Sequence, residues 1–138
     1  MKNACFAIVA AMVLMLAVAP AYGQMDVTST LKLGISFSFS VVNRTLPAGE
    51  YLFAPLNDKT IKIQNVDGQH SVVVMTGSVI SGSGPQRPKL VFHRYGDRYF
   101  LSQAWLRYSD AGRELFVSAQ ELELARTQTQ STIIVEGN

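Results

Sequence analysis

Few side chains in this sequence could perform acid–base, nucleophilic or metal chemistry. It contains two histidines, His70 and His93, and one cysteine, Cys5. A histidine-dependent nucleophilic site needs a nucleophile and an orienting acid within hydrogen-bonding reach, and Asp97 is the acid close to His93 in the sequence. The sequence has no G-x-S-x-G motif, and two histidines without a nearby thiol supply a metal site poorly. We therefore predict no catalytic residue, no metal site and no cofactor, and we expect that the protein is not an enzyme.

The segment KLVFHRYGDRYFLSQAW, residues 89–105, combines aromatic and cationic side chains more densely than the rest of the chain. Gly96 and Asp97 in its middle form a two-residue hairpin loop of type II′, with glycine in the first position. The resulting register pairs the flanking residues in order, as far as Leu90 with Gln103. We therefore predict that this segment is a β-hairpin.

Both faces of this hairpin carry aromatic side chains, whereas a one-sided antiparallel sheet has one polar face. Either the hairpin is central, with one face in the core and the other beneath a helix or loop, or one face lines a ligand cavity or a protein contact. Arg94 over Tyr99 and Arg98 beside Tyr95 are expected as cation–π pairs, which need no ligand. The candidate ligand or contact residues are Phe92, His93, Arg94, Tyr95, Arg98, Tyr99, Phe100 and Trp105.

The amino-terminal sequence has the layout of a secretory signal peptide. Lys2 precedes an uncharged apolar run over residues 4–19, and small residues follow at positions 19, 21 and 23. This run is short for a membrane span, which needs about 20 residues, and no later segment approaches that length. We predict a signal peptide over residues 1–23, with cleavage before Gln24 or, as the alternative, after Ala21. The protein is then exported to the periplasm, the cell surface or the exterior.

The predicted mature chain, residues 24–138, has a composition that excludes several kinds of partner and cross-link. Its charges are interspersed, and the net charge falls from +2 to +1 once Lys2 is removed, whereas nucleic-acid binding requires a concentrated basic face. Cys5 lies within the signal segment, so the mature chain has no disulfide and its core must hold it together. This length suffices for one core, and we expect a single domain.

Alternating apolar and polar residues predict strands along most of the mature chain. Residues 34–42 alternate apolar and serine side chains, which predicts one half-buried strand. Asp67 and Gly68 separate two further alternating segments and predict a hairpin with a type I′ turn. That hairpin pairs Ile63 with Val72, which brings the apolar residues of both strands onto one face.

The last third of the chain predicts one helix and one strand. Ser118 and Glu121 have the spacing of a capping box, so we predict a short helix over residues 119–127, and residues 132–136 read as a last strand. The chain is therefore expected to be all-β, an antiparallel meander that forms a small barrel or sandwich, with one short helix before the last strand. Pairing of the last strand with the first would close the barrel and remove exposed edges.

Four motifs are distinctive when taken together. They are LPAGEY at residues 46–51, IQNVDG at 63–68, LVFHRYGDRYFLS at 90–102 followed by Trp105, and GREL at 112–115. Over about residues 35–126 the chain resembles a group of small secreted bacterial β proteins of uncharacterised function. The resemblance implies an exported bacterial β protein and supplies no catalytic residues. The order of elements is also similar in outline to lipocalin-like barrels, although no lipocalin signature lies near the first strand.

Three functional hypotheses follow, of which a hydrolase or isomerase built around His93 ranks last. The first is an exported, non-enzymatic protein with a structural or protein-interaction role, whose partner is another envelope protein or a second copy of the chain. The second is a lipocalin-like barrel that binds a small apolar ligand. The residues expected to line such a barrel, which would equally well fill a solid core, are Phe37, Phe39, Phe53, Phe92, Tyr99 and Trp105. We rank the structural or interaction role first.

Overall fold

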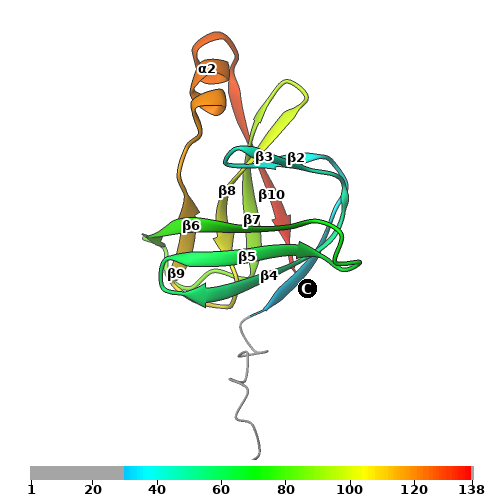
Figure 1. Ribbon diagram of the computed structural model, residues 1–138. Coiled ribbons are helices and arrows are strands. Elements are labelled where there is room, and N and C mark those ends of the chain that lie inside the picture. The colour runs from blue at the N-terminus through cyan, green and yellow to red at the C-terminus, as the bar shows by residue number, and fades with distance from the viewer. Residues whose placement is uncertain (1–29, 138) are drawn as a thin grey trace, which may run out of the picture.

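A computed structural model describes residues 30–137 (Figure 1). The predicted signal peptide and both cleavage sites lie outside the described residues. The strands are β1 (Leu31–Ile35), β2 (Phe39–Val41), β3 (Arg44–Leu46), β4 (Gly49–Asn57), β5 (Thr60–Asn65), β6 (Ser71–Ile80), β7 (Lys89–Tyr95), β8 (Arg98–Trp105), β9 (Ala111–Leu115) and β10 (Gln130–Glu136), and the helix α2 (Ala119–Thr127) lies between β9 and β10. The all-β class and the short helix before the last strand are confirmed.

The strands form one large sheet that does not close into a barrel. Its order is β1-β4-β5-β6-β9-β8-β2-β3, and β7 pairs with both β8 and β10. The last strand does not pair with the first, the pairing that would close a barrel, because β10 pairs with β7 and β1 pairs with β4. The Gly137 N–H donates to the Pro88 carbonyl at 2.9 Å, so the end of the chain is held at the start of β7.

The sheet bends so that β4, β5 and β6 lie across β7, β8 and β10 (Figure 1). Aromatic rings fill the space between these two layers. The Phe39 ring meets Tyr51 and Phe92 edge to face, with centroid separations of 5.2 and 5.6 Å. Phe53 and Phe92 are completely buried, and burying a side chain of this size stabilises a fold by about 1.5–3 kcal/mol. The interior is therefore a packed core.

The single strand predicted over residues 34–42 is wrong, because a bend separates β1 from β2. The Phe37 ring turns out of the strand direction and stacks on Tyr99, with ring centroids 3.9 Å apart. Ser40, expected on a solvated face, is buried, and its hydroxyl lies 3.3 Å from that of Thr45. An aromatic contact and a hydrogen bond of the buried Ser40 hydroxyl thus override the alternation of the sequence.

The hairpin between β5 and β6 has the predicted register, with Ile63 opposite Val72. Its turn differs from the prediction, since a type I′ turn needs positive φ at both central residues and here only Gly68 has it, at +75°. The Gly68 N–H donates to the Asn65 carbonyl at 2.9 Å. The loop therefore spans four residues rather than two, while the apolar pattern still sets the strand register.

The β7–β8 hairpin also has the predicted pairing near its turn. Gly96 has a φ of +62°, as the first position of a type II′ turn requires. A bulge between Val91 and Phe92 then shifts the register, so that Leu90 lies opposite Ala104 rather than opposite Gln103 as predicted. The bulge adds one residue to β8, so the residues of β8 beyond it point to the opposite face from the one predicted.

Trp105, at the end of β8, packs on the backbone of β9. A Cβ atom added to Gly112 would lie 2.6 Å from the Trp105 ring, and Trp105 is only 4% exposed. The Lys89 ammonium lies 5.6 Å from the same ring. Trp105 thus acts in packing, and it depends on a glycine for its position.

We expect Gly112→Ala to lower the free energy of unfolding by about 1–3 kcal/mol, because the added methyl group displaces the Trp105 ring. Gly77→Ala is the matched control, since nothing lies within 4 Å of the atom added there. Urea unfolding of both variants measures the difference. Equal stability of the two variants would contradict this account of Trp105.

Candidate functional site

A buried carboxylate joins helix α2 to strands β7 and β10. Glu121, on α2, is 6% exposed, and its Oε2 atom lies 3.1 Å from His93 Nδ1 and accepts a hydrogen bond of 3.1 Å from the Tyr95 hydroxyl. That hydroxyl also lies 3.0 Å from Gln130 Oε1, so its single proton is shared between two acceptors. We call these four residues, Glu121, His93, Tyr95 and Gln130, the Glu121 cluster.

The start of α2 directs Glu121 into this cluster. Half of the predicted capping box forms, because Ser118 Oγ accepts a hydrogen bond of 3.1 Å from the Glu121 N–H. The Glu121 carboxylate does not return to the Ser118 backbone, and binds His93 and Tyr95 instead. Asp97, the acid nearest to His93 in the sequence, is exposed in the hairpin turn. The orienting acid of His93 therefore comes from a residue 28 positions away, which sequence reasoning assigned to capping alone.

The cluster raises the pKa of Tyr95 to about 12. Burial is the main cause, and the Glu121 carboxylate adds to it both by its charge and by accepting the hydrogen bond. A neutral tyrosine hydroxyl is thus fixed as a donor to a carboxylate across the neutral pH range. At neutral pH Tyr95 is therefore a neutral hydrogen-bond donor rather than an ionised group.

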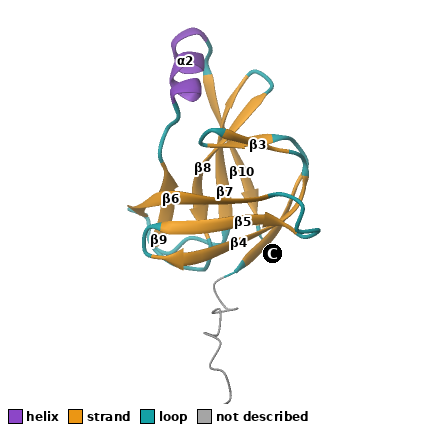
Figure 2. Ribbon diagram, viewed as in Figure 1, coloured by secondary structure: helices purple, strands orange, loops and turns teal. Residues whose placement is uncertain are grey.

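The helix depends on this polar contact more than on apolar packing. Glu121 is the only buried residue of α2, whereas Leu122 is 54% exposed. A helix of nine residues is marginal by itself in water. Both α2 and the tip of the β7–β8 hairpin stand at the same end of the molecule (Figure 2). The outer face of the hairpin is therefore partly covered by a helix, the first of the two arrangements considered above.

The exposed side of the hairpin tip carries a stack of three side chains. The Arg94 guanidinium lies 5.3 Å from the Tyr99 ring, as predicted, and Phe37 covers the other face of that ring. Arg98 was predicted beside Tyr95 and instead lies over Phe100, at 5.5 Å. The Tyr95 hydroxyl is bound to Glu121, and Arg98 lies over the buried Phe100 ring instead.

The predicted contact residues therefore divide into two groups. Four are at most 4% exposed and cannot form a contact surface: Phe92, Tyr95, Phe100 and Trp105. The other four retain exposed atoms near the hairpin tip: His93, Arg94, Arg98 and Tyr99. The structure does not bring these four together around a common hollow, because Arg94 and Tyr99 share one face of the hairpin while His93 and Arg98 share the other.

A second surface, which sequence reasoning missed, lies between β6 and the β2–β3 hairpin. It is a groove of about 320 Å³ lined by Val41, Val42, Asn43, Arg44, Val72, Val73, Val74, Met75 and Phe116. We call it the β6 groove. Met75 and Phe116 also line an adjoining hollow of about 450 Å³. The signal in the sequence was a failure of alternation, since Val73 and Met75 are apolar at positions that the register sets on the outer face.

The β6 groove has two unusual features. Val73, Met75 and Phe116 are 56%, 59% and 62% exposed, and a run of exposed apolar side chains of this size is uncommon on a monomer. Val42, at the turn of the β2–β3 hairpin, has a φ of +54°, which is strained for a β-branched residue. Strain of this kind costs about 1–3 kcal/mol and is found preferentially at functional surfaces.

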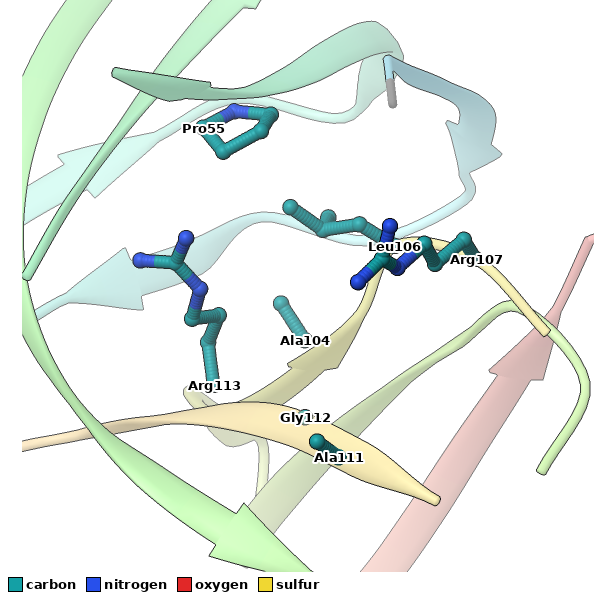
Figure 3. Close-up of a pocket in the computed structure, with 7 residues that line it drawn as sticks. All are labelled: Pro55, Ala104, Leu106, Arg107, Ala111, Gly112 and Arg113. Atoms are coloured by element: carbon teal, nitrogen blue, oxygen red, sulfur yellow. The ribbon is translucent and has the colours of Figure 1, made fainter. Parts of the chain in front are cut away.

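A third hollow, at the opposite end of β8, is small. It is lined by Pro55, Ala104, Leu106, Arg107, Ala111, Gly112 and Arg113 and has a volume of about 160 Å³ (Figure 3). Arg113 Nη1 donates to Thr76 Oγ1 at 3.4 Å. Small-molecule sites usually measure about 300–1,000 Å³, so this hollow is too small for an apolar ligand of lipocalin type.

Residues 30–137 contain no group of three histidine, cysteine or acidic side chains placed to hold a metal ion. In the same part of the chain, no helix has both the length and the apolar character needed to cross a membrane. No protein-family model, curated protein or solved structure matches the chain. Its function must therefore be argued from its own surfaces.

We expect Glu121→Ala to lower the free energy of unfolding by about 1–3 kcal/mol, because His93 Nδ1 loses its partner and the buried Tyr95 hydroxyl keeps only Gln130 as an acceptor. Glu123→Ala is the matched control on the same helix, since Glu123 is exposed and pairs only with exposed Arg126. Its effect should stay within about 0.5 kcal/mol. Thermal or urea unfolding measures both, and a Glu123 effect as large as that of Glu121 would contradict a structural role for the cluster.

The raised pKa of Tyr95 predicts a specific loss of stability in alkaline solution. Tyr95 ionises near pH 10 in the unfolded chain and near pH 12 in the folded chain. The stability that the neutral Tyr95 hydroxyl contributes is therefore complete below pH 10 and is lost between pH 10 and pH 12. That contribution is on the order of 2 kcal/mol. The stability difference between the wild type and Tyr95→Phe should therefore shrink over this window. Urea unfolding at a series of pH values measures this difference, and a difference that stays constant would disprove the assignment. Burial also raises the pKa of Tyr51, but Tyr51 is present in both proteins, so its effect cancels.

Proposed function

We propose that the protein is an exported, non-enzymatic β domain with a structural or protein-interaction role in the periplasm or at the cell surface. The observation that carries the proposal is the β6 groove, where apolar side chains are exposed together along one strand. Interface centres are poor in charged residues and enriched in aromatic residues and methionine. Among the groove residues only Arg44 is charged, and Met75 and Phe116 are the largest exposed apolar side chains.

The packing of the core favours this role over apolar-ligand binding. Of the residues expected to line a ligand cavity, Phe39, Phe53 and Phe92 are at most 1% exposed and Trp105 is packed against Gly112. A lipocalin-like site requires an interior volume that side chains leave open. These rings occupy the interior themselves, so the surface is the better place to seek a partner.

The Glu121 cluster supports the non-enzymatic part of the proposal. His93 is oriented by an acid, but the Tyr95 hydroxyl beside it is held neutral by burial and by Glu121. Nucleophilic catalysis needs an activated nucleophile next to the base. The cluster instead satisfies every member with a hydrogen-bond partner, which is typical of a buried structural network.

Site-specific photo-crosslinking in cells that export the chain tests the groove. A photoreactive residue at position 73 should give a discrete adduct, and Met75→Glu should abolish it by placing a charge in the apolar contact. Ile80→Glu is the matched control, because Ile80 lies on the same strand, is 67% exposed and is outside the groove. An adduct that both variants reduce equally would overturn the proposal. So would native mass spectrometry of the exported protein that shows a stoichiometric small apolar molecule.

A further inference from the structure

The carboxyl-terminal part of the chain is attached to the rest through one strand. We call residues 118–137, which contain α2 and β10, the arm. In the described residues β10 pairs only with β7, over all seven of its residues. The one buried side chain of α2, Glu121, also binds residues of β7. Ile133 and Val135 add partly buried contacts to the core. Separation of the arm from β7 would therefore release it as a unit.

The connection between the arm and β9 consists of two exposed apolar residues. Phe116 and Val117 lie between Leu115, the last residue of β9, and Ser118, the residue that caps α2. They are 62% and 51% exposed. Apolar residues are an unusual choice for a solvated connection, whereas phenylalanine and valine are both favoured in strands.

Strand β6 has an unpaired edge directly beside this connection. β9 pairs with β6 along Thr76–Ile80. The Thr76 N–H donates to the Lys59 carbonyl on the β5 side, so β9 occupies the other edge. Along residues 71–75 that other edge has no strand partner within the described part of the chain. An unpaired edge flanked by exposed apolar side chains favours pairing with a further strand.

The register between β9 and β6 connects these two features. Thr76 lies opposite Leu115. Two more residues in the same register would place Phe116 opposite Met75 and Val117 opposite Val74. The connection would then become strand and cover the β6 groove. In the single chain these residues do not pair with β6, because the chain leaves β6 after Leu115 and runs to α2 (Figure 1).

We propose that two copies of the chain exchange their arms: in each copy residues 116–117 extend β9 along β6, and the arm docks on β7 of the other copy. This inference rests on the proposed function, since it names a second copy as the interaction partner; the β6 groove is then covered by residues 116–117 of its own chain. The β7 surface of the other copy fits the arm, because the arm already occupies the identical surface within its own chain. The Glu121 cluster and the β7–β10 ladder are kept, with their members now in different chains.

The energetics of the exchange are set by the connection rather than by the arm. Contacts between the arm and β7 are the same in both forms and cancel. The exchanged form gains backbone pairing at the connection and burial of Phe116 and Met75, and it pays the entropy of association. Its population therefore rises with protein concentration. Interconversion is slow, because the Glu121 cluster and the ladder must separate first.

A disulfide formed between two chains tests the exchange directly. Val91 and Ile134 are opposite residues of β7 and β10, and opposed positions in antiparallel strands fall within the Cα separation that a disulfide accepts. In a Cys5→Ser background, Val91→Cys protein is mixed with Ile134→Cys protein, unfolded in urea, refolded together and oxidised. We expect a disulfide-linked heterodimer, because only exchange brings the two thiols together.

Three controls define the result. A single chain with both substitutions must form an internal disulfide; should it fail, Arg94→Cys and Ser131→Cys form the replacement pair, which is also opposed and exposed. Val91→Cys mixed with Ile80→Cys should give no heterodimer above the level of random collision. Val117→Pro, which prevents extension of β9, should reduce the heterodimer at least several-fold without preventing the internal disulfide.

The outcomes separate this inference from the proposed function. An internal disulfide without any heterodimer overturns the exchange. If position 73 still gives a crosslink that depends on Met75, the groove binds a partner other than a second copy. A heterodimer supports the exchange, and a photoreactive residue at position 73 should then crosslink within its own chain, because residues 116–117 of that chain cover the groove. Absence of both the heterodimer and the adduct overturns both proposals.

Discussion

A carboxylate that is 6% exposed holds three segments of this chain together. Glu121 anchors α2, satisfies two donors on β7 and, through the shared proton of Tyr95, contacts the start of β10. Burial of a charge is costly unless its partners are in place, so the position of the helix is coupled to that of both strands. Apolar burial holds the rest of the molecule, but at this end a single polar contact sets the arrangement.

This dependence explains why the aromatic hairpin is a scaffold. Its inner face supplies Phe92 to the core, and its outer face supplies Tyr95 and His93 to the Glu121 cluster. Few side chains remain free at its tip, and those lie on opposite faces. The richest chemistry in the sequence is thus used for folding, while the accessible apolar surface lies along β6, a strand with ordinary composition.

Local patterns predicted what local physics determines. Strand pairing around Gly96, the register that pairs Ile63 with Val72, and the helix over residues 119–127 all follow from turn residues, alternation and capping. Features that depend on contacts distant in sequence were not predictable: the bend that frees Phe37 to stack on Tyr99, the acid that reaches His93 from α2, and the failure of the sheet to close. Each is decided by a partner whose distance along the chain no local pattern encodes.

The β6 groove shows how such a missed feature is still recorded in the sequence. Val73 and Met75 break the alternation of β6 on the face that the register turns outward, and Phe116 and Val117 do the same for a solvated connection. Taken separately, each is an exposed apolar residue of the kind found on any surface. Taken together, they lie on one unpaired strand edge and on the segment whose register leads to that edge. One further pairing, between β6 and the residues that follow β9, accounts for all four.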